Sequence, residues 1–93
     1  MDNKFFEDVR KITFSFIKEN GAKIFLSIDE NKTINELLNE YYKKDNRFDL
    51  VNNYDNYIKF NYNAGCILNK FKTKKIKDII NRDIATIIVF EIS

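Results

Sequence analysis

The chain has 93 residues, of which 44% are hydrophobic, and its 16 basic and 14 acidic side chains leave a formal net charge of +2. This length builds one small domain around a single core, and this charge balance does not favour nucleic acid or an anionic membrane as the main partner. No apolar run reaches the ~18 residues of a membrane-spanning helix, and acidic residues replace the apolar part of a secretory signal, so we expect an intracellular protein of the cytoplasm or nucleus with no membrane span.

Residues 1–10 are predicted to form a short N-terminal extension, followed by one domain over residues 11–93. Phe5, Phe6 and Val9 lie on one side of an amphipathic turn that is too short to hold a helix by itself. Packing on the domain, or fraying, is favoured over a dedicated binding helix.

Two strands joined by a turn follow the extension. Residues 12–16 and 24–28 each alternate large apolar side chains with other residues, so each segment has one apolar face at the period of a β-strand. Phe25 is itself apolar but points away from the face of its neighbours. Asn20 and Gly21 both tolerate positive φ and are predicted to close the hairpin.

A helix is predicted to begin directly after the second strand. Thr33 stands where an N-cap belongs, and Glu36, three residues later, completes a capping box. Ile34, Leu37, Leu38 and Tyr41 follow at helical spacing, and the helix is predicted to end near Lys44. Since it follows the hairpin so closely, this helix must cover the apolar face of the two strands.

The second half of the chain predicts further strands. A polar connecting loop extends to Asn56, alternation resumes over residues 57–62, and a turn leads into a short strand at 66–68. After a basic connection, the nearly continuous apolar run 84–90 is typical of a central strand with neighbours on both sides, one of them the first strand. The sequence thus predicts an α+β domain with a mixed sheet of four to five strands packed on one main helix.

This order of elements is that of the β-grasp fold, and the residues from about Lys11 to Phe90 resemble the ubiquitin-like superfamily. Residues 24–34 resemble the second strand and helix start of ubiquitin, and residues 58–68 are similar to the strand, turn and short strand of the superfamily. The helix core resembles that of the small ubiquitin-like modifiers at Ile34, Leu37 and Tyr41. The resemblance implies a ubiquitin-like roll and is more specific for fold than for function.

Two departures limit what the resemblance implies about activity. Conjugated members end in an exposed Gly-Gly, whereas this chain ends with residues 90–93, Phe-Glu-Ile-Ser, so we expect a divergent member that is not a conjugated modifier. The exposed aliphatic residue at the centre of ubiquitin's binding patch is replaced here by Asn61 or Lys59. Receptors that recognise that patch are therefore not expected to bind tightly.

The residue types argue against an enzyme. The chain contains no histidine, so Cys66 has no obvious general base and belongs to no Cys/His metal site, and a single cysteine forms no internal disulfide. Asp29 and Glu30 are explained by the strand-to-helix turn, and neither glycine lies in a phosphate-binding loop. We expect no catalysis, no metal and no cofactor.

The sequence therefore predicts a protein-interaction module, such as an adaptor or complex subunit, with a protein partner. The first candidate surface is the groove between the second strand and the helix, with Phe25 in an outward position and Leu38 and Tyr42 at the helix flank. In the small ubiquitin-like modifiers, the corresponding groove accepts an extended peptide as an added strand. Coverage of this groove by the N-terminal segment is the alternative.

The second candidate surface is the outer side of the last strand. Ile88 and Phe90 have the opposite parity to Ile87 and Val89, so one of these pairs must face away from the helix. Next to Lys59 and Asn61, such residues would form a contact patch, unless a loop folds over them. The sequence leaves open which pair faces outward, and it leaves open the oligomeric state.

The competing interpretation is a basic segment that binds nucleic acid or an acidic ligand. Clustered cations neutralise phosphates, and an aromatic side chain such as Phe71 could stack on a base. Anchoring of the segment to the core is the alternative role of Phe71. The cations of this segment are Lys70, Lys72, Lys74, Lys75 and Lys77.

Overall fold

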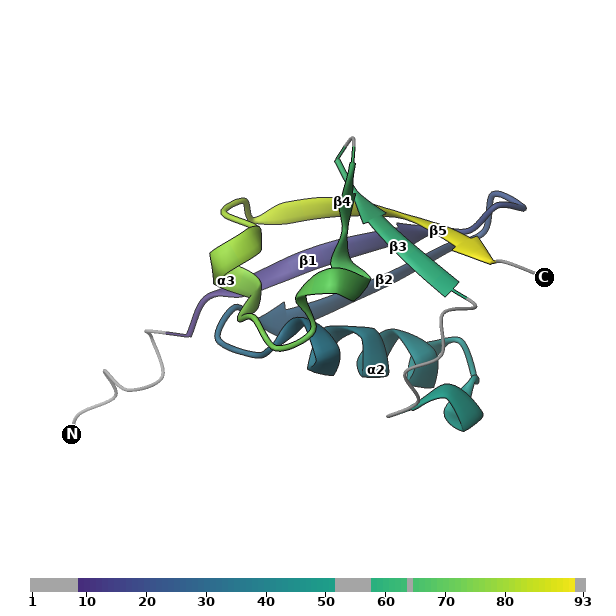
Figure 1. Cartoon of the computed structure of the whole chain (residues 1–93), viewed down its shortest axis with the longest axis horizontal. Coiled ribbons are helices and arrows are strands. Elements are labelled where there is room, and N and C mark those ends of the chain that lie inside the picture. The colour runs from purple at the N-terminus through teal and green to yellow at the C-terminus, as the bar shows by residue number, and fades with distance from the viewer. Residues whose placement is uncertain (1–8, 52–57, 64, 92–93) are drawn as a thin grey trace.

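The computed structural model describes residues 9–51, 58–63 and 65–91. One main helix lies across one face of a five-stranded sheet (Figure 1). The elements in chain order are β1 (Lys11–Ile17), β2 (Lys23–Asp29), α2 (Ile34–Lys44), the short 3-10 helix η1 (Phe48–Leu50), β3 (Ile58–Tyr62), β4 (Cys66–Ile67), the 3-10 helix η2 (Leu68–Phe71), the short helix α3 (Ile76–Ile79) and β5 (Ile84–Glu91). The predicted α+β class with a mixed sheet is confirmed.

The strand order is β2-β1-β5-β3-β4, with β5 parallel to β1 and antiparallel to β3. The predicted central place of β5 is thereby confirmed. Ala85, Ile87 and Val89 are buried beneath α2, so the alternate residues of β5 face the opposite side of the sheet. A strand with a neighbour on each edge and a helix over one face buries much of its apolar surface, which fits its nearly continuous apolar sequence.

The turn between β1 and β2 is longer than a two-residue turn. The N–H of Lys18 donates to the carbonyl of Ala22 at 2.8 Å, and the N–H of Gly21 donates to the carbonyl of Lys18 at 2.9 Å. Gly21 has a φ of +90°, whereas Asn20 keeps a negative φ and accepts a bond from the Ala22 N–H through its side chain. The predicted hairpin is present, and the glycine alone supplies the left-handed residue.

Helix α2 has the predicted capping box and ends at Lys44, as predicted. The Thr33 side chain accepts from the Glu36 N–H at 3.1 Å, and the Glu36 carboxylate accepts from the Thr33 N–H at 2.9 Å. The next free helix donors are satisfied by a distant segment, because the N–H groups of Ile34 and Asn35 donate to the carbonyls of Lys74 and Lys72. The basic connection after η2 is thereby fixed against the start of the helix.

The core is rich in aromatic rings between α2 and the sheet. The ring of Tyr41 lies 4.6 Å from that of Phe16 and 5.2 Å from that of Phe60, measured between centroids. Pairs at such distances add to the free energy gained from burial alone.

Leu38 and Tyr42 also belong to this core, with exposed fractions of 2% and 5%. The prediction that they line an outer groove is therefore wrong. More than one side of α2 is buried, because the helix packs against η1 and η2 as well as against the sheet. The Tyr42 ring lies 5.9 Å from that of Phe60. Burial on this flank is favoured because each large apolar side chain gains free energy when it leaves water.

Candidate functional site

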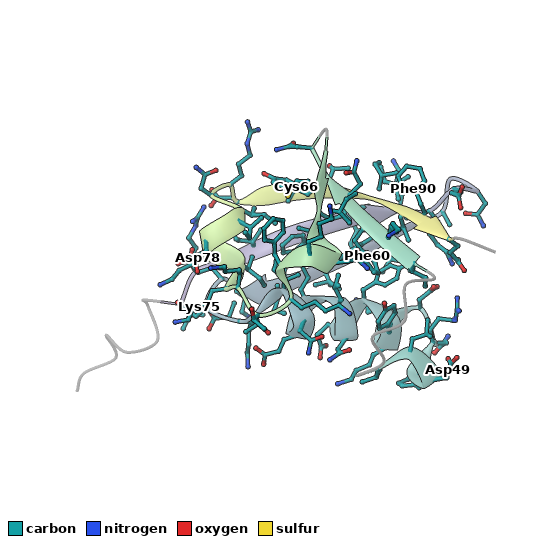
Figure 2. The ribbon with its side chains drawn as sticks, in the orientation of Figure 1. Asp49, Phe60, Cys66, Lys75, Asp78 and Phe90 are labelled. Carbon is teal, nitrogen blue, oxygen red and sulfur yellow. The ribbon has the colours of Figure 1, made fainter. Side chains whose placement is uncertain are left out.

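Four of the predicted contact residues lie together on the face of the sheet that α2 does not cover. Lys59 is paired with Phe90 and Asn61 is paired with Ile88 across β3 and β5. We call these four residues the outer-strand patch. Phe90 is 43% exposed, Ile88 is half-buried, and both face away from the helix, which settles the parity that the sequence left open. Figure 2 shows Phe90 pointing away from the layer occupied by α2.

Apolar residues that sequence analysis did not single out extend this face. Ile17 of β1 is opposite Ile88, Ile67 of β4 is opposite Asn61, and both are half-buried. Ile84, at the start of β5, is 67% exposed on the same face. The parity that Ile84 shares with Ile88 and Phe90 was the sequence signal that could have identified it.

Phe25 is 56% exposed, but it does not line the groove between β2 and α2. Leu26 and Ile28 of β2 face the helix, so Phe25, the residue before Leu26, points to the other side of the sheet, opposite Ser15 of β1. The prediction that placed Phe25 in this groove is corrected by the period of the strand. Phe25 belongs instead to the same face as the outer-strand patch.

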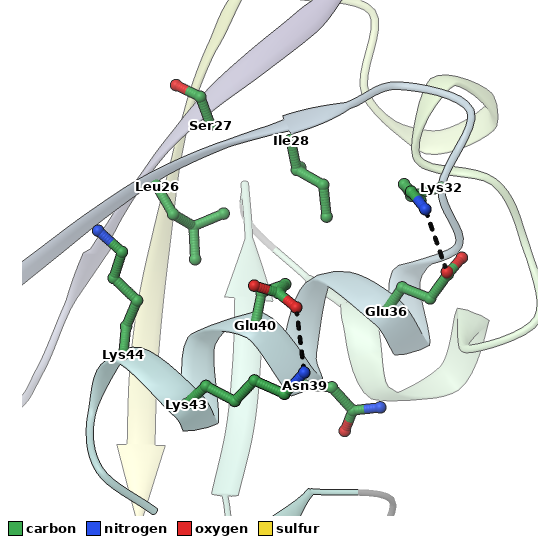
Figure 3. A pocket seen from close by; sticks show the side chains of 9 residues that line it. All are labelled: Leu26, Ser27, Ile28, Lys32, Glu36, Asn39, Glu40, Lys43 and Lys44. Atoms are coloured by element: carbon green, nitrogen blue, oxygen red, sulfur yellow. Dashed lines mark hydrogen bonds and ion pairs between the residues drawn. The ribbon is translucent and has the colours of Figure 1, made fainter.

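The groove between β2 and α2 has a volume of about 430 Å³. Figure 3 shows Leu26 and Ile28 at its base and charged side chains from α2 along its rim. Two ion pairs cross the helix surface there, Lys32 to Glu36 at 3.7 Å and Lys43 to Glu40 at 3.4 Å. The complete lining is Leu26, Ser27, Ile28, Lys32, Glu36, Asn39, Glu40, Lys43 and Lys44. The rim therefore carries both signs of charge.

The basic segment presents four exposed lysines, Lys70, Lys74, Lys75 and Lys77, while Lys72 is half-buried. Its backbone is held by the bonds to α2 described above and by a bridge between Lys75 and Thr33. The ring of Phe71 packs against the core, as its alternative role predicts. Figure 2 shows that Lys75 and the acidic Asp78 lie at the same end of the molecule.

The carboxylates of the strand-to-helix turn have structural partners. Asp29 accepts hydrogen bonds from the backbone and side chain of Asn31 at 2.8 and 3.1 Å. Glu30 pairs with Arg10 at 3.1 Å, and Arg10 also pairs with Asp83 at 2.7 Å. The hydrogen bond to Asp83, more than the one to Glu30, raises the pKa of the Arg10 guanidinium. These bonds attach the start of β1 to the domain, whereas Phe5 and Phe6 lie outside the described residues.

The sequence matches no protein-family model and no curated protein. Solved structures do match: the ubiquitin-like domain of Arabidopsis thaliana protein At2g32350 has a TM-score of 0.71 at 16% identity, over 100% of this chain and 89% of that chain. The chain has the ubiquitin-like β-grasp fold. A second structure of the same Arabidopsis protein gives a TM-score of 0.69 at 17% identity, over 92% of each chain. SUMO from Trypanosoma brucei gives 0.61 at 20% identity, over 91% of this chain and 74% of that chain.

The predicted resemblance to the ubiquitin-like superfamily is thus confirmed at the level of the fold. Within this ubiquitin-like fold, the outer-strand patch lies on the sheet face that α2 does not cover. The β2–α2 groove lies at the β2 edge, on the face that α2 covers. No helix among the described residues is long and apolar enough to cross a bilayer.

Proposed function

We propose that this protein is a non-catalytic interaction module, an adaptor or a subunit of a larger complex, that binds a protein partner through the outer-strand patch. The observation that supports this most directly is Phe90, a large aromatic side chain that is 43% exposed near the end of the central strand, on the sheet face that α2 leaves uncovered. Exposed aromatic residues on ordered strands are favoured as interface anchors, because they cover much apolar area at little cost in side-chain entropy.

The surroundings of Phe90 support an interface with an apolar centre and a polar rim. Ile88 and Ile17 lie side by side on neighbouring strands, while Lys59 and Asn61 supply a cation and an amide on the other side. Such a distribution is typical of the core and rim of protein interfaces. The matching partner surface has an aliphatic or aromatic centre with an acidic group placed to meet Lys59.

Affinity isolation with the native chain as bait tests this proposal when it is repeated with patch variants. Phe90→Ala is expected to lower recovery of the retained protein about tenfold, the change that corresponds to ~1.4 kcal/mol. Lys59→Glu should lower it too, since it reverses the charge at the rim. Phe48→Ala is the matched control, because Phe48 is 62% exposed on η1, outside the patch. Unchanged recovery with both patch variants contradicts the proposal.

The second candidate function is binding of nucleic acid or another acidic ligand by the basic segment. Its support is the backbone attachment of Lys72 and Lys74 to α2, which holds neighbouring lysines in fixed positions. A salt titration of binding to mixed oligonucleotides separates the two candidates. Affinity that falls steeply with salt favours the basic segment, and absence of binding at low salt excludes nucleic acid as its ligand.

A further inference from the structure

The sheet has two edges, and among the described residues they differ in how far their backbone groups are satisfied. At the edge formed by β3 and β4, the side chain of Asn69 accepts from the Phe60 N–H at 2.9 Å and donates to the Ile58 carbonyl at 2.8 Å. Strand β4 pairs with the rest of β3. This edge is closed to a further strand at those positions.

The β2 edge is open. In an antiparallel ladder only every second residue of a strand bonds to a given neighbour. The bonds from Lys18 to Ala22 and from Glu30 to Arg10, at the two ends of the β1–β2 ladder, assign Ile24, Leu26 and Ile28 to the bonded set. The N–H and C=O groups of Lys23, Phe25 and Ser27 therefore face outward. Within the described part of the chain, no hydrogen bond satisfies them.

This open edge lacks the features that usually prevent strand addition. Its seven residues contain no proline, their pairing with β1 is regular and without a bulge, and their charges stand only at the two ends, Lys23 and Asp29. An edge of this kind is a template for another strand. Phe25, at 56% exposure, lies next to the central residue of this strand and on the outer face of the sheet.

The sequence of β2, Lys-Ile-Phe-Leu-Ser-Ile-Asp, is complementary to itself in the antiparallel direction. We propose that a second copy of this chain occupies the β2 edge, with its own β2 antiparallel and a two-fold axis at Leu26. In this register each residue of one strand meets a compatible residue of the other: Lys23 with Asp29, Ile24 with Ile28, Phe25 with Ser27, and Leu26 with Leu26.

The backbone agrees with this register. The backbone N–H and C=O groups of Phe25 and Ser27 face outward. In this register Phe25 of each copy is therefore hydrogen-bonded directly to Ser27 of the other copy. Leu26 bonds to β1, so it forms the closer, non-bonded pair on the axis. The two Phe25 rings are diagonal neighbours on the outer face, within reach of each other. Such pairing removes from water the aromatic surface that the single chain exposes.

Charge selects this register over its neighbours. A shift of the axis to Phe25 places Asp29 opposite Gly21, and a shift to Ser27 places Asp29 opposite Phe25, so the two end charges find no opposite partner. Only the axis at Leu26 brings both ends of β2 into opposite-charge pairs, which favour antiparallel pairing across strands. The rim of the β2–α2 groove carries both signs, so the helix of the second copy meets no field of a single sign.

Sedimentation equilibrium of the full chain between about 1 μM and about 1 mM tests the dimer, since one strand edge buries a small area and should dissociate on dilution. Lys23→Glu sets two acidic groups against each other, and Asp29→Lys sets two cations against each other. Each variant alone is expected to dimerise at least tenfold more weakly. A one-to-one mixture should recover the association, because opposite charges then meet at both ends. Arg82→Glu makes the same charge change at an exposed position outside β2 and outside the outer-strand patch, and it should dimerise normally.

A disulfide crosslink reports the register without changing the charges at the ends of β2 or the turn in which Asp29 accepts its hydrogen bonds. With Cys66→Ser to remove the native thiol, Leu26→Cys should give a disulfide-linked dimer on mild oxidation, because non-bonded antiparallel pairs have Cα atoms about 4.5 Å apart. Ser27→Cys in the same background should not crosslink efficiently, because position 27 lies opposite Phe25 of the second copy.

A chain that stays monomeric over the whole concentration range overturns the proposal. This is the expected result if a different peptide, or residues 1–8 of the same chain, occupies the β2 edge. A dimer that is insensitive to Lys23→Glu, or one without the Leu26→Cys crosslink, also overturns the proposal. None of these results depends on the outer-strand patch.

Discussion

The side-chain oxygen of Asn69 accepts a hydrogen bond from the backbone N–H of Phe60 at 2.9 Å, although Asn69 lies in η2 and not in a strand. The amide nitrogen of Asn69 donates to the carbonyl of Ile58 at 2.8 Å. One amide side chain thus pairs with both types of backbone group, as a neighbouring strand would. This contact satisfies the edge of β3 where the two-residue strand β4 does not reach.

Asn69→Ala is expected to lower the free energy of unfolding by about 1–3 kcal/mol, because it leaves a donor and an acceptor of a buried strand without partners. Urea denaturation followed by circular dichroism measures this loss. Asn81→Ala is the matched control, since Asn81 is exposed and should change stability by less than about 0.5 kcal/mol. Equal stability of the two variants would contradict the assigned role of Asn69.

The capping box predicts a dependence of stability on pH. The hydrogen bond from the Thr33 backbone, and to a smaller extent its hydroxyl and Lys32, lower the pKa of Glu36 below its usual value of 4.5. A lowered folded-state pKa gives stability that is present above the usual carboxylate pKa and is lost as the pH falls through the folded-state pKa. Unfolding curves of Glu36→Gln should therefore depend less on pH than those of the native chain below about pH 4.5. Equal pH dependence of the two chains below about pH 4.5 would contradict this contribution of Glu36.

Tyr41→Ala is expected to cost about 3–5 kcal/mol, because it removes a ring that is only 1% exposed and leaves a cavity between Phe16 and Phe60. Tyr41→Phe keeps the ring and should retain most of that stability. The measurement is the midpoint of denaturant unfolding at neutral pH. A loss below about 1 kcal/mol for Tyr41→Ala would show that the helix repacks without this ring.

The Tyr41 hydroxyl predicts a second pH effect, at the alkaline end. Burial, and then the nearby charges of Asp45 and Glu91, raise the pKa of Tyr41 above its usual value of 10.0. The folded state keeps the phenol neutral, so this group destabilises the fold as the pH rises above the pKa of the unfolded chain. The thermal unfolding temperature of Tyr41→Phe should fall less steeply above about pH 10 than the unfolding temperature of the native chain. Parallel curves would mean that Tyr41 ionises equally in both states.

Gly21→Ala is expected to destabilise the hairpin by about 1–2 kcal/mol, because a residue with a side chain is disfavoured at a φ of +90°. Outside residues 20–22, no atom of the described chain lies within 4 Å of the position that the added Cβ would take, so the cost comes from the local backbone conformation and not from a clash with packed neighbours. Gly21→Asn should cost less than Gly21→Ala, since asparagine adopts left-handed conformations more readily. Chemical denaturation of both variants ranks these costs, and the reverse order would contradict the explanation.

Local patterns predicted much of the fold. Ile12, Phe14 and Phe16 alternate with smaller residues in the sequence, and all three are fully buried in the structure. Thr33 and Glu36 marked the start of α2, because the bonds of a capping box join residues three positions apart. Signals of this kind depend on neighbours along the chain, so they can be recognised without knowledge of the tertiary contacts.

The candidate surfaces depended on contacts between distant segments. The apolar run in β5 has no period of two, so only its pairing with β1 and β3 turned Ile88 and Phe90 outward and buried Ile87. Tyr42 looked available on its helix, but the packing of α2 against β3 placed its ring beside Phe60. The sequence alone determined which segments are strands and helix and where the helix begins. Only the tertiary structure decided which apolar residues stay exposed, because solvent exposure depends on what the rest of the chain places over each side chain.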